Sequence, residues 1–387
     1  MKNKARIIFA LTACLLLSFL LFTLPVIAEE QENNNTETIP KEFFELLEIL
    51  PDDVKNLLPE GVFSQDSQTV GAAVGEMSSF SYLLNSVLSA IGLRFGDCAR
   101  LLATVCGLLI LSAVCNTVKN NLPSLRMGRA FSFCATLVIL LSIITQTVRS
   151  LRGVTDYFST LNAMTAAVLP LSSALYVMGG NVTTASVSSA GLSVFLTLLE
   201  ELVGKSILPF CGICAAFALV NALDGTVRIG TLLSTLKKNY TTILTFLMML
   251  LLAMLASQTA LAAKSDTLAM RSVKFAAGNL IPVVGGSVSE LLRTVSASVG
   301  YLRGVVGICG ILLLLLTLLP TLAELFLMRL TWQLSASLAD ILGCDSEKKL
   351  LDEFASILGF LIAAVSICSS VLVLALSLLS HTASAIG

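Results

Sequence analysis

The sequence predicts an all-α, polytopic membrane protein, and three observations point to that class. The 387 residues are 56% hydrophobic and only 13% charged, whereas soluble domains carry about 25% charged residues. Uncharged runs recur along the chain at about the 20 residues that a helix needs to cross the hydrocarbon core. The chain also begins with a basic and then apolar segment that is typical of an export signal. The net charge of −1 gives no support to nucleic-acid binding.

Residues 1–28 have the three parts of a secretory signal peptide. Met1–Arg6 is basic, an apolar run starts at Ile7, and Ala28 precedes the acidic pair Glu29–Glu30 at the expected cleavage site. The apolar run is also long enough for an uncleaved anchor, so both outcomes stay open. In either case the residues that follow Ala28 are expected outside the cytoplasm.

Residues 29–97 are expected to form an exported linker with short amphipathic helices. The acidic stretch EEQENNNTET is typical of a disordered linker. After it, apolar residues recur at helical spacing from Pro40 to Leu50, which predicts one short helix, and Asp52–Leu58 predicts a second. These helices would form either a cap on the membrane surface or an arm that docks a partner.

Residues 98–387 are expected to form the transmembrane domain, with six to eight spans. Short connections and two prolines, Pro170 and Pro209, leave the number of spans in the middle of the domain undecided. With eight spans, Lys and Arg divide almost equally between the two sides, so the sequence leaves the orientation beyond the second span open. The eight uncharged runs are Leu101–Val118, Ala130–Val148, Tyr157–Met178, Val182–Leu199, Ser206–Leu223, Tyr240–Ala263, Gly304–Ala323 and Phe354–Ser380.

The stretch SVKFAAGNLIPVVGGSVSE, Ser272–Glu290, is apolar but is a poor candidate for one continuous helix. Proline disfavours a helical conformation at the residue before it, and paired glycines allow backbone that other residues avoid. Non-helical backbone at membrane depth requires cover by protein or water. We therefore interpret the stretch as a re-entrant or pore-lining segment, with a surface loop as the alternative. The residues expected to matter are Lys274, Gly278, Asn279, Pro282, Gly285 and Gly286.

Four ionisable residues beside apolar runs are further candidates, because charged groups inside a membrane are often functional. Glu200, Glu201 and Lys205 could line a polar path, or they could mark a turn at the membrane interface. Glu324 follows Pro320 and could equally mark the end of a helix. The glycines around Gly304 favour close helix packing, in a tight bundle or in an oligomer.

The residue supply argues against an enzyme and against a cofactor. His381 is the only histidine and follows the last apolar run, which excludes an HExxH zinc site and a Ser–His pair. Gly204-Lys205-Ser206 resembles the end of a phosphate-binding loop, but Leu199 stands where that motif needs glycine. Cys211 and Cys214 have redox spacing, but they lie in an apolar run where small residues serve packing.

Three segments carry a family likeness: KFAAGNLIPVVGG at Lys274–Gly286, LKKNYTTILTFLMMLL at Leu236–Leu251, and the carboxy-terminal run Trp332–Leu379. With the signal peptide, the short exported helices and the polytopic body, they resemble the stage III sporulation protein AE family of endospore-forming bacteria, and the resemblance runs through the whole chain. The resemblance implies a multi-pass protein of the mother-cell-derived outer forespore membrane. It also implies a channel-like, secretion-like complex with other stage III sporulation membrane proteins of the same operon and a forespore membrane partner. The resemblance brings no catalytic residues with it.

A stand-alone secondary transporter of small solutes is the rival interpretation. It would use the same broken segment as its binding site, but the sequence shows no convincing inverted repeat of the kind common in such transporters. Solute flux by the purified protein alone would favour the transporter. Co-purification with sporulation proteins, without flux, would favour the channel subunit.

Overall fold

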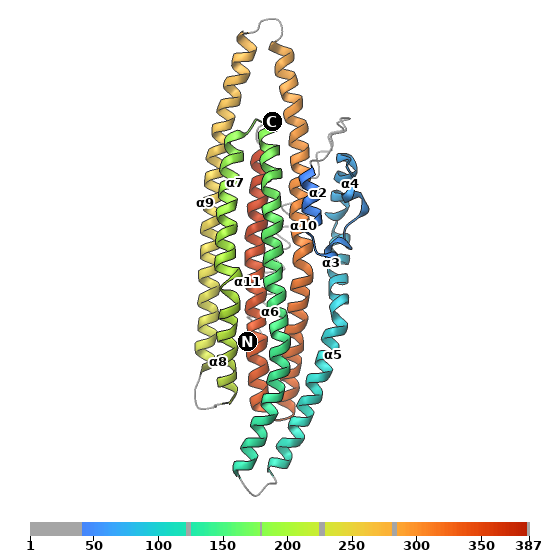
Figure 1. Cartoon of the computed structure of the whole chain (residues 1–387), viewed down its shortest axis with the longest axis vertical. Coiled ribbons are helices and arrows are strands. Elements are labelled where there is room, and N and C mark those ends of the chain that lie inside the picture. The colour runs from blue at the N-terminus through green and yellow to red at the C-terminus, as the bar shows by residue number, and fades with distance from the viewer. Residues whose placement is uncertain (1–40, 121–124, 179, 224–228, 281–284, 385–387) are drawn as a thin grey trace.

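The computed structural model describes residues 41–120, 125–178, 180–223, 229–280 and 285–384. The predicted signal peptide and the acidic linker up to residue 40 lie outside these residues. All described elements are helical (Figure 1). In chain order they are α2 (Lys41–Glu48), α3 (Asp52–Lys55), η2 (Glu60–Phe63), α4 (Ser67–Met77), α5 (Phe80–Asn120), α6 (Leu125–Met178), α7 (Val182–Leu199), η3 (Glu200–Gly204), α8 (Ile207–Leu223), α9 (Ile229–Leu280), α10 (Gly285–Ile341) and α11 (Asp345–Ser384).

Six of the described helices are long and apolar enough to cross a membrane, which confirms the polytopic class at the lower end of the expected range. Two runs expected as separate spans, Ala130–Val148 and Tyr157–Met178, belong to the single helix α6. The charged residues between them, Arg149, Arg152 and Asp156, lie on the helix surface. They need no loop, because Arg is a good helix former and Asp is acceptable at an exposed helical position.

Helices α7 and α8 form one interrupted column that packs antiparallel to α9. At one end Thr184 of α7 bonds Asp266 of α9, and further along Ser206 bonds Tyr240 at 2.5 Å. The interruption between them is η3, a π turn in which the Lys205 N–H donates to the Glu200 carbonyl, five residues back, at 3.1 Å. The short connection that the sequence shows between the two runs is therefore a widened helical turn rather than a loop.

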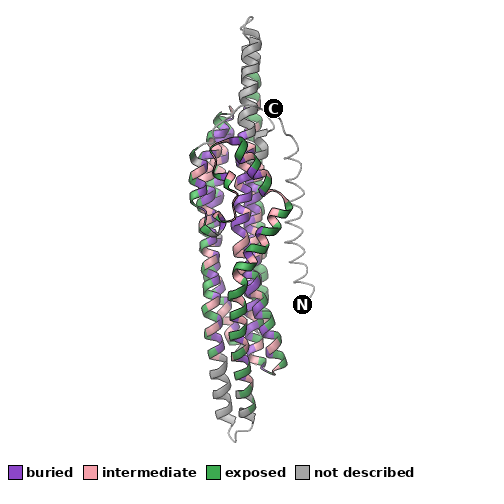
Figure 2. Cartoon of the chain, turned by 90° about the vertical axis from the view of Figure 1, so that its right-hand side faces the viewer, coloured by how far each residue is buried: buried purple, intermediate pink, exposed green. Residues whose placement is uncertain are grey.

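Helix α11 is the centre of the bundle. It contacts α6, α8, α9 and α10, and 72% of its apolar span is buried, the largest share among the six candidate spans in the described chain. Figure 2 shows the buried residues concentrated where the long helices face one another. Fully buried aromatic residues, among them Trp332 of α10 and Phe354 of α11, fill the interior.

Two tight turns depend on glycine with positive φ. Gly180 has φ 77° at the end of α6, and Gly343 has φ 70° at the end of α10. In both turns the next residue donates back across the helix end, Asn181 N to Tyr176 O at 2.8 Å and Cys344 N to Ala339 O at 2.9 Å. This is the Schellman pattern, in which a left-handed glycine ends a helix. Each turn brings two long helices directly alongside one another.

The amino-terminal helices α2 to α4 pack against α6 and α10 as one hydrophobic cluster. Phe43, Leu46 and Leu47 are almost completely buried, which confirms the amphipathic helix predicted over Pro40–Leu50. The second predicted helix is shorter than expected, because α3 ends at Lys55. Asp66 caps the start of α4. Its carboxylate accepts from the Thr69 hydroxyl and from the backbone N–H groups of Gln68 and Thr69, and these hydrogen bonds lower its pKa.

Candidate functional site

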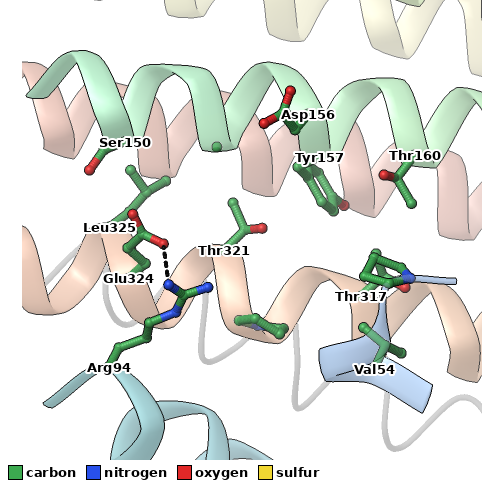
Figure 3. Close-up of a pocket in the computed structure, with 13 residues that line it drawn as sticks. Val54, Arg94, Ser150, Asp156, Tyr157, Thr160, Thr317, Thr321, Glu324 and Leu325 are labelled. Carbon is green, nitrogen blue, oxygen red and sulfur yellow. Dashed lines mark ion pairs between the residues drawn. The ribbon is translucent and has the colours of Figure 1, made fainter. Parts of the chain in front are cut away.

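A pocket lined by apolar and polar side chains lies at mid-height in the bundle, between α6 and α10, with α5 and α3 at its edge (Figure 3). Its volume of about 170 Å³ is large enough to hold water. Pro320 interrupts the hydrogen-bond ladder of α10 beside it. Because proline has no N–H, α10 lacks one backbone hydrogen bond beside the pocket.

An ion pair lies at one end of the cavity. Arg94 Nη1 of α5 lies 3.7 Å from Glu324 Oε2 of α10, and their side chains are 40% and 24% exposed. Glu324, which the sequence singled out, therefore lies inside α10 rather than at a helix end. An ion pair this accessible to solvent contributes little stability, of the order of 1 kcal/mol or less.

Hydroxyl groups make up most of the remaining polar lining. Figure 3 shows Ser150, Tyr157 and Thr160 of α6 on one side and Thr317 and Thr321 of α10 on the other. Tyr157 bonds Ser369 of α11 at 2.7 Å, which links the cavity wall to the central helix. The Ser150 hydroxyl is buried and has no protein partner. Buried hydroxyls normally have a partner, so this one is suited to a bound water or a polar solute.

The other ionisable candidates lie at η3, on the outside of the bundle. Glu201 and Lys205 form an ion pair with both side chains more than half exposed. Glu200 accepts from the Asn162 side chain of α6 at 3.0 Å. Asn162 lies only two residues beyond Thr160, so η3 is at nearly the same height as the cavity but on another face of α6. These three residues are therefore separate from Glu324, and they favour the interpretation as a polar turn.

The Gly/Pro-rich stretch lies far from the cavity. Lys274, Gly278 and Asn279 fall in the last turns of α9, and Gly285 and Gly286 begin α10, while Pro282 lies outside the described residues. From Gly285 to Glu324 is 39 residues of continuous α10, about 58 Å at 1.5 Å per residue. Figure 1 shows α9 and α10 extending together beyond α6 and α7. The pore-lining role of this stretch stays a prediction.

Sequence reasoning missed Arg94, Asp156, Tyr157 and the cavity itself. Arg94 lies in α5 four residues before the boundary at 98 that was expected for the transmembrane domain, and α5 begins at Phe80. The signal that could have located the ion pair was the charge of Arg94 within a largely apolar helix. Within the described residues no group of His, Cys, Asp and Glu side chains could hold a metal ion.

Comparison with known proteins identifies the family of this bundle. The family model for stage III sporulation protein AE matches residues 68–383, which include α5 to α11 almost completely. The chain belongs to the stage III sporulation protein AE family. It is 22% identical over 332 residues to stage III sporulation protein AE of Bacillus subtilis (strain 168), covering 86% of this chain and 80% of that relative. No solved structure matches the chain.

The family match includes both charged groups of the cavity ion pair, Arg94 and Glu324, and all of η3. It starts after α2 and α3, which supply Pro51 and Val54 to the cavity edge. The matched region is therefore mostly the bundle of long helices. Membership of the family implies a sporulation role, and the six apolar helices indicate a multi-pass membrane protein.

Proposed function

We propose that this protein is a membrane subunit of a channel-like, secretion-like complex that connects the mother cell and the forespore during sporulation. It would reside in the mother-cell-derived outer forespore membrane. Its partners would be the other stage III sporulation membrane proteins of the same operon and a protein of the forespore membrane. The protein would act by assembly and passage rather than by catalysis.

Family membership over residues 68–383 carries this proposal. The structure is consistent with it in two respects. The bundle has a pocket with several polar side chains at mid-height, between α6 and α10, and polar groups at membrane depth are tolerated where protein or water covers them. The amino-terminal helices are packed on that same wall, where an exported segment could contact the partners.

The test combines a deletion with a purification. We expect a strain that lacks the gene to complete engulfment and then to lose late forespore gene expression, and expression of the full-length protein should restore it. The tagged protein should co-purify with the other stage III membrane proteins from sporulating cells. Normal sporulation of the deletion strain would overturn the proposal.

The transporter alternative is tested on the same preparation. The purified protein is reconstituted alone into liposomes and offered small charged and neutral solutes. We expect no solute uptake above that of empty liposomes, because a channel subunit needs its partners to form a passage. Saturable uptake of one solute by the protein alone would favour the transporter.

A further inference from the structure

The amino-terminal unit, which we define as α2, α3, η2 and α4, packs against two apolar runs of the bundle. Its buried side chains form one cluster with α6 residues within Met164–Leu175 and α10 residues within Leu302–Leu316. The α6 contacts lie inside the uncharged run Tyr157–Met178, and nearly all the α10 contacts lie inside the uncharged run Gly304–Ala323. Figure 1 shows α2 to α4 alongside α10. The unit therefore lies beside these runs and not beyond an end of the bundle.

Both runs have the length of a membrane crossing. Tyr157–Met178 has 22 residues and Gly304–Ala323 has 20, which is about 33 Å and about 30 Å of helix, against a hydrocarbon core of about 30 Å. The contacts of the unit on α6 extend over 11 residues of that run, about 17 Å. A bilayer that covers the two runs therefore also covers the level of the amino-terminal unit.

The outer face of the amino-terminal unit is polar and mainly acidic. Glu45 and Glu48 of α2, Asp52 of α3 and Glu60 of η2 are all exposed, whereas the apolar side chains of α2 face α6 and are buried. Charged side chains are costly in hydrocarbon, and at membrane depth they face protein or a water-filled space. This outer face is therefore suited to water and not to lipid chains.

The other side of the bundle is apolar at the same level. Helices α6 and α7 are antiparallel, and Asn162 of α6 bonds Glu200 at 3.0 Å. Val194, six residues before Glu200, is thus level with about residue 168 of α6, among the contacts of the unit. Its side chain is 52% exposed, as is that of Met254, which lies on α9 between the two α9 residues that bond the interrupted column. Figure 1 shows α7 and α9 on the side of the bundle away from α2 to α4.

The amino-terminal unit also forms part of the pocket between α6 and α10. Pro51 and Val54 line that pocket together with Arg94 and Glu324, the ion pair between α5 and α10. The same short segment thus contributes apolar side chains to the pocket edge and acidic side chains to the outer face. A polar surface on the unit would place water next to a pocket that already contains charged groups.

We propose that water reaches the outer face of the amino-terminal unit at membrane depth, so that α2 to α4 line an aqueous vestibule beside the pocket. Lipid chains would cover the bundle on the α7 and α9 side and would be excluded from the side of the unit. The excess of carboxylates would favour water and small cations over anions in this vestibule. The proposal does not depend on the sporulation role, because it concerns the isolated protein in a bilayer.

The experiment compares two exposed positions on each side of the bundle. Single cysteines are introduced into the full-length, otherwise cysteine-free protein as Glu45→Cys, Glu48→Cys, Val194→Cys and Met254→Cys, and each carries a nitroxide spin label in liposomes. Collisions of the label are measured with oxygen, which concentrates in hydrocarbon, and with a nickel chelate, which stays in water. We expect nickel collisions to be at least fivefold more frequent at the two glutamate positions than at Val194 and Met254, and oxygen collisions to show the opposite order.

Three outcomes would overturn the proposal. Nickel collisions as rare at Glu45 and Glu48 as at Val194 would place the outer face in lipid, and frequent nickel collisions at Val194 and Met254 would place the whole level outside the bilayer. Adding Leu46→Asp to Glu48→Cys should detach the unit and make the label more mobile. An unchanged mobility would show that the unit is not docked in the bilayer. Either glutamate position alone decides the question if the other variant does not fold.

Discussion

Asp266 shows at the residue scale how a buried charge can serve the fold alone. Its carboxylate is 3% exposed and accepts from the backbone N–H groups of Thr183 and Thr184 and from the Thr184 hydroxyl. These are the first N–H groups of α7, which have no partner inside their own helix. A carboxylate of α9 thus caps a helix that begins after a tight glycine turn.

We expect Asp266→Ala to destabilise the protein by about 2 kcal/mol, because charged hydrogen bonds to buried donors are lost together. The measurement is the thermal unfolding midpoint in detergent. Ser265→Ala, at the exposed neighbouring position, is the control and should leave the midpoint unchanged. Equal midpoints for Asp266→Ala and the wild type would show that α7 does not need this cap.

Gly359 and Gly310 should respond to alanine with opposite signs. At Gly359 the new methyl group would meet the Arg329 guanidinium, whereas at Gly310 no atom lies within 4 Å. Crowding should cost about 1 kcal/mol for Gly359→Ala, and Gly310→Ala should gain up to about 1 kcal/mol from helix propensity. Unfolding midpoints of the two variants in detergent check this. A stabilised Gly359→Ala variant would contradict the close approach of Arg329.

The individual site residues were only partly predictable from the sequence. Glu324 was identified because a charge inside an apolar run is conspicuous. Its partner Arg94 was not, since the two are 230 positions apart in the chain and nothing local connects them.

At the scale of elements, α2 is the clearest case of a helix that is defined by its apolar face. Leu46 is 1% exposed and packs with the cluster on α6 and α10, whereas Ile49, in the turn that follows α2, is 38% exposed. We expect Leu46→Asp to detach α2 to α4 from the bundle, because a buried unpaired carboxylate is strongly unfavourable. Limited proteolysis should then cleave near α3, while Ile49→Asp stays resistant. Equal resistance of both variants would contradict the docking.

The elements themselves were predictable wherever the apolar pattern was long, and less so at their junctions. The runs in α9, α10 and α11 were located correctly, because uncharged stretches of membrane length permit little else. The division of α6 was wrong: Arg149 and Asp156 suggested a loop, but both lie on the exposed side of a continuous helix. The π turn at η3 could not be predicted from the sequence. The residues on both sides of it keep helical spacing, and the turn displaces one side relative to the other by a single residue.

At the scale of the whole molecule, the longest helices exceed the thickness of a membrane. Helix α10 has 57 residues, about 85 Å, against a hydrocarbon core of about 30 Å. Helices α9 and α10 run antiparallel, with the last residue of α9 and the first residue of α10 at the same end of the bundle. The two flanks of the Gly/Pro-rich stretch should therefore lie on one side of the membrane.

This arrangement is tested by placing single cysteines at Ser272 and Glu290 in a cysteine-free background. A membrane-impermeant thiol reagent should label both from the same side of the membrane. Labelling of the two positions from opposite sides would mean that the stretch crosses the bilayer. The topology of every helix after it would then be inverted.

The position of α11 also determines when the bundle can be completed during synthesis. The helix that contacts α6, α8, α9 and α10 and buries 72% of its span follows those four helices in the chain. The preceding helices can insert and pair as they emerge, but their inner faces lack a partner until the 40-residue helix α11 arrives. The native core is therefore completed only after α11 has been synthesised. A chain that stops before α11 would leave those inner faces uncovered and open to the cell's proteases.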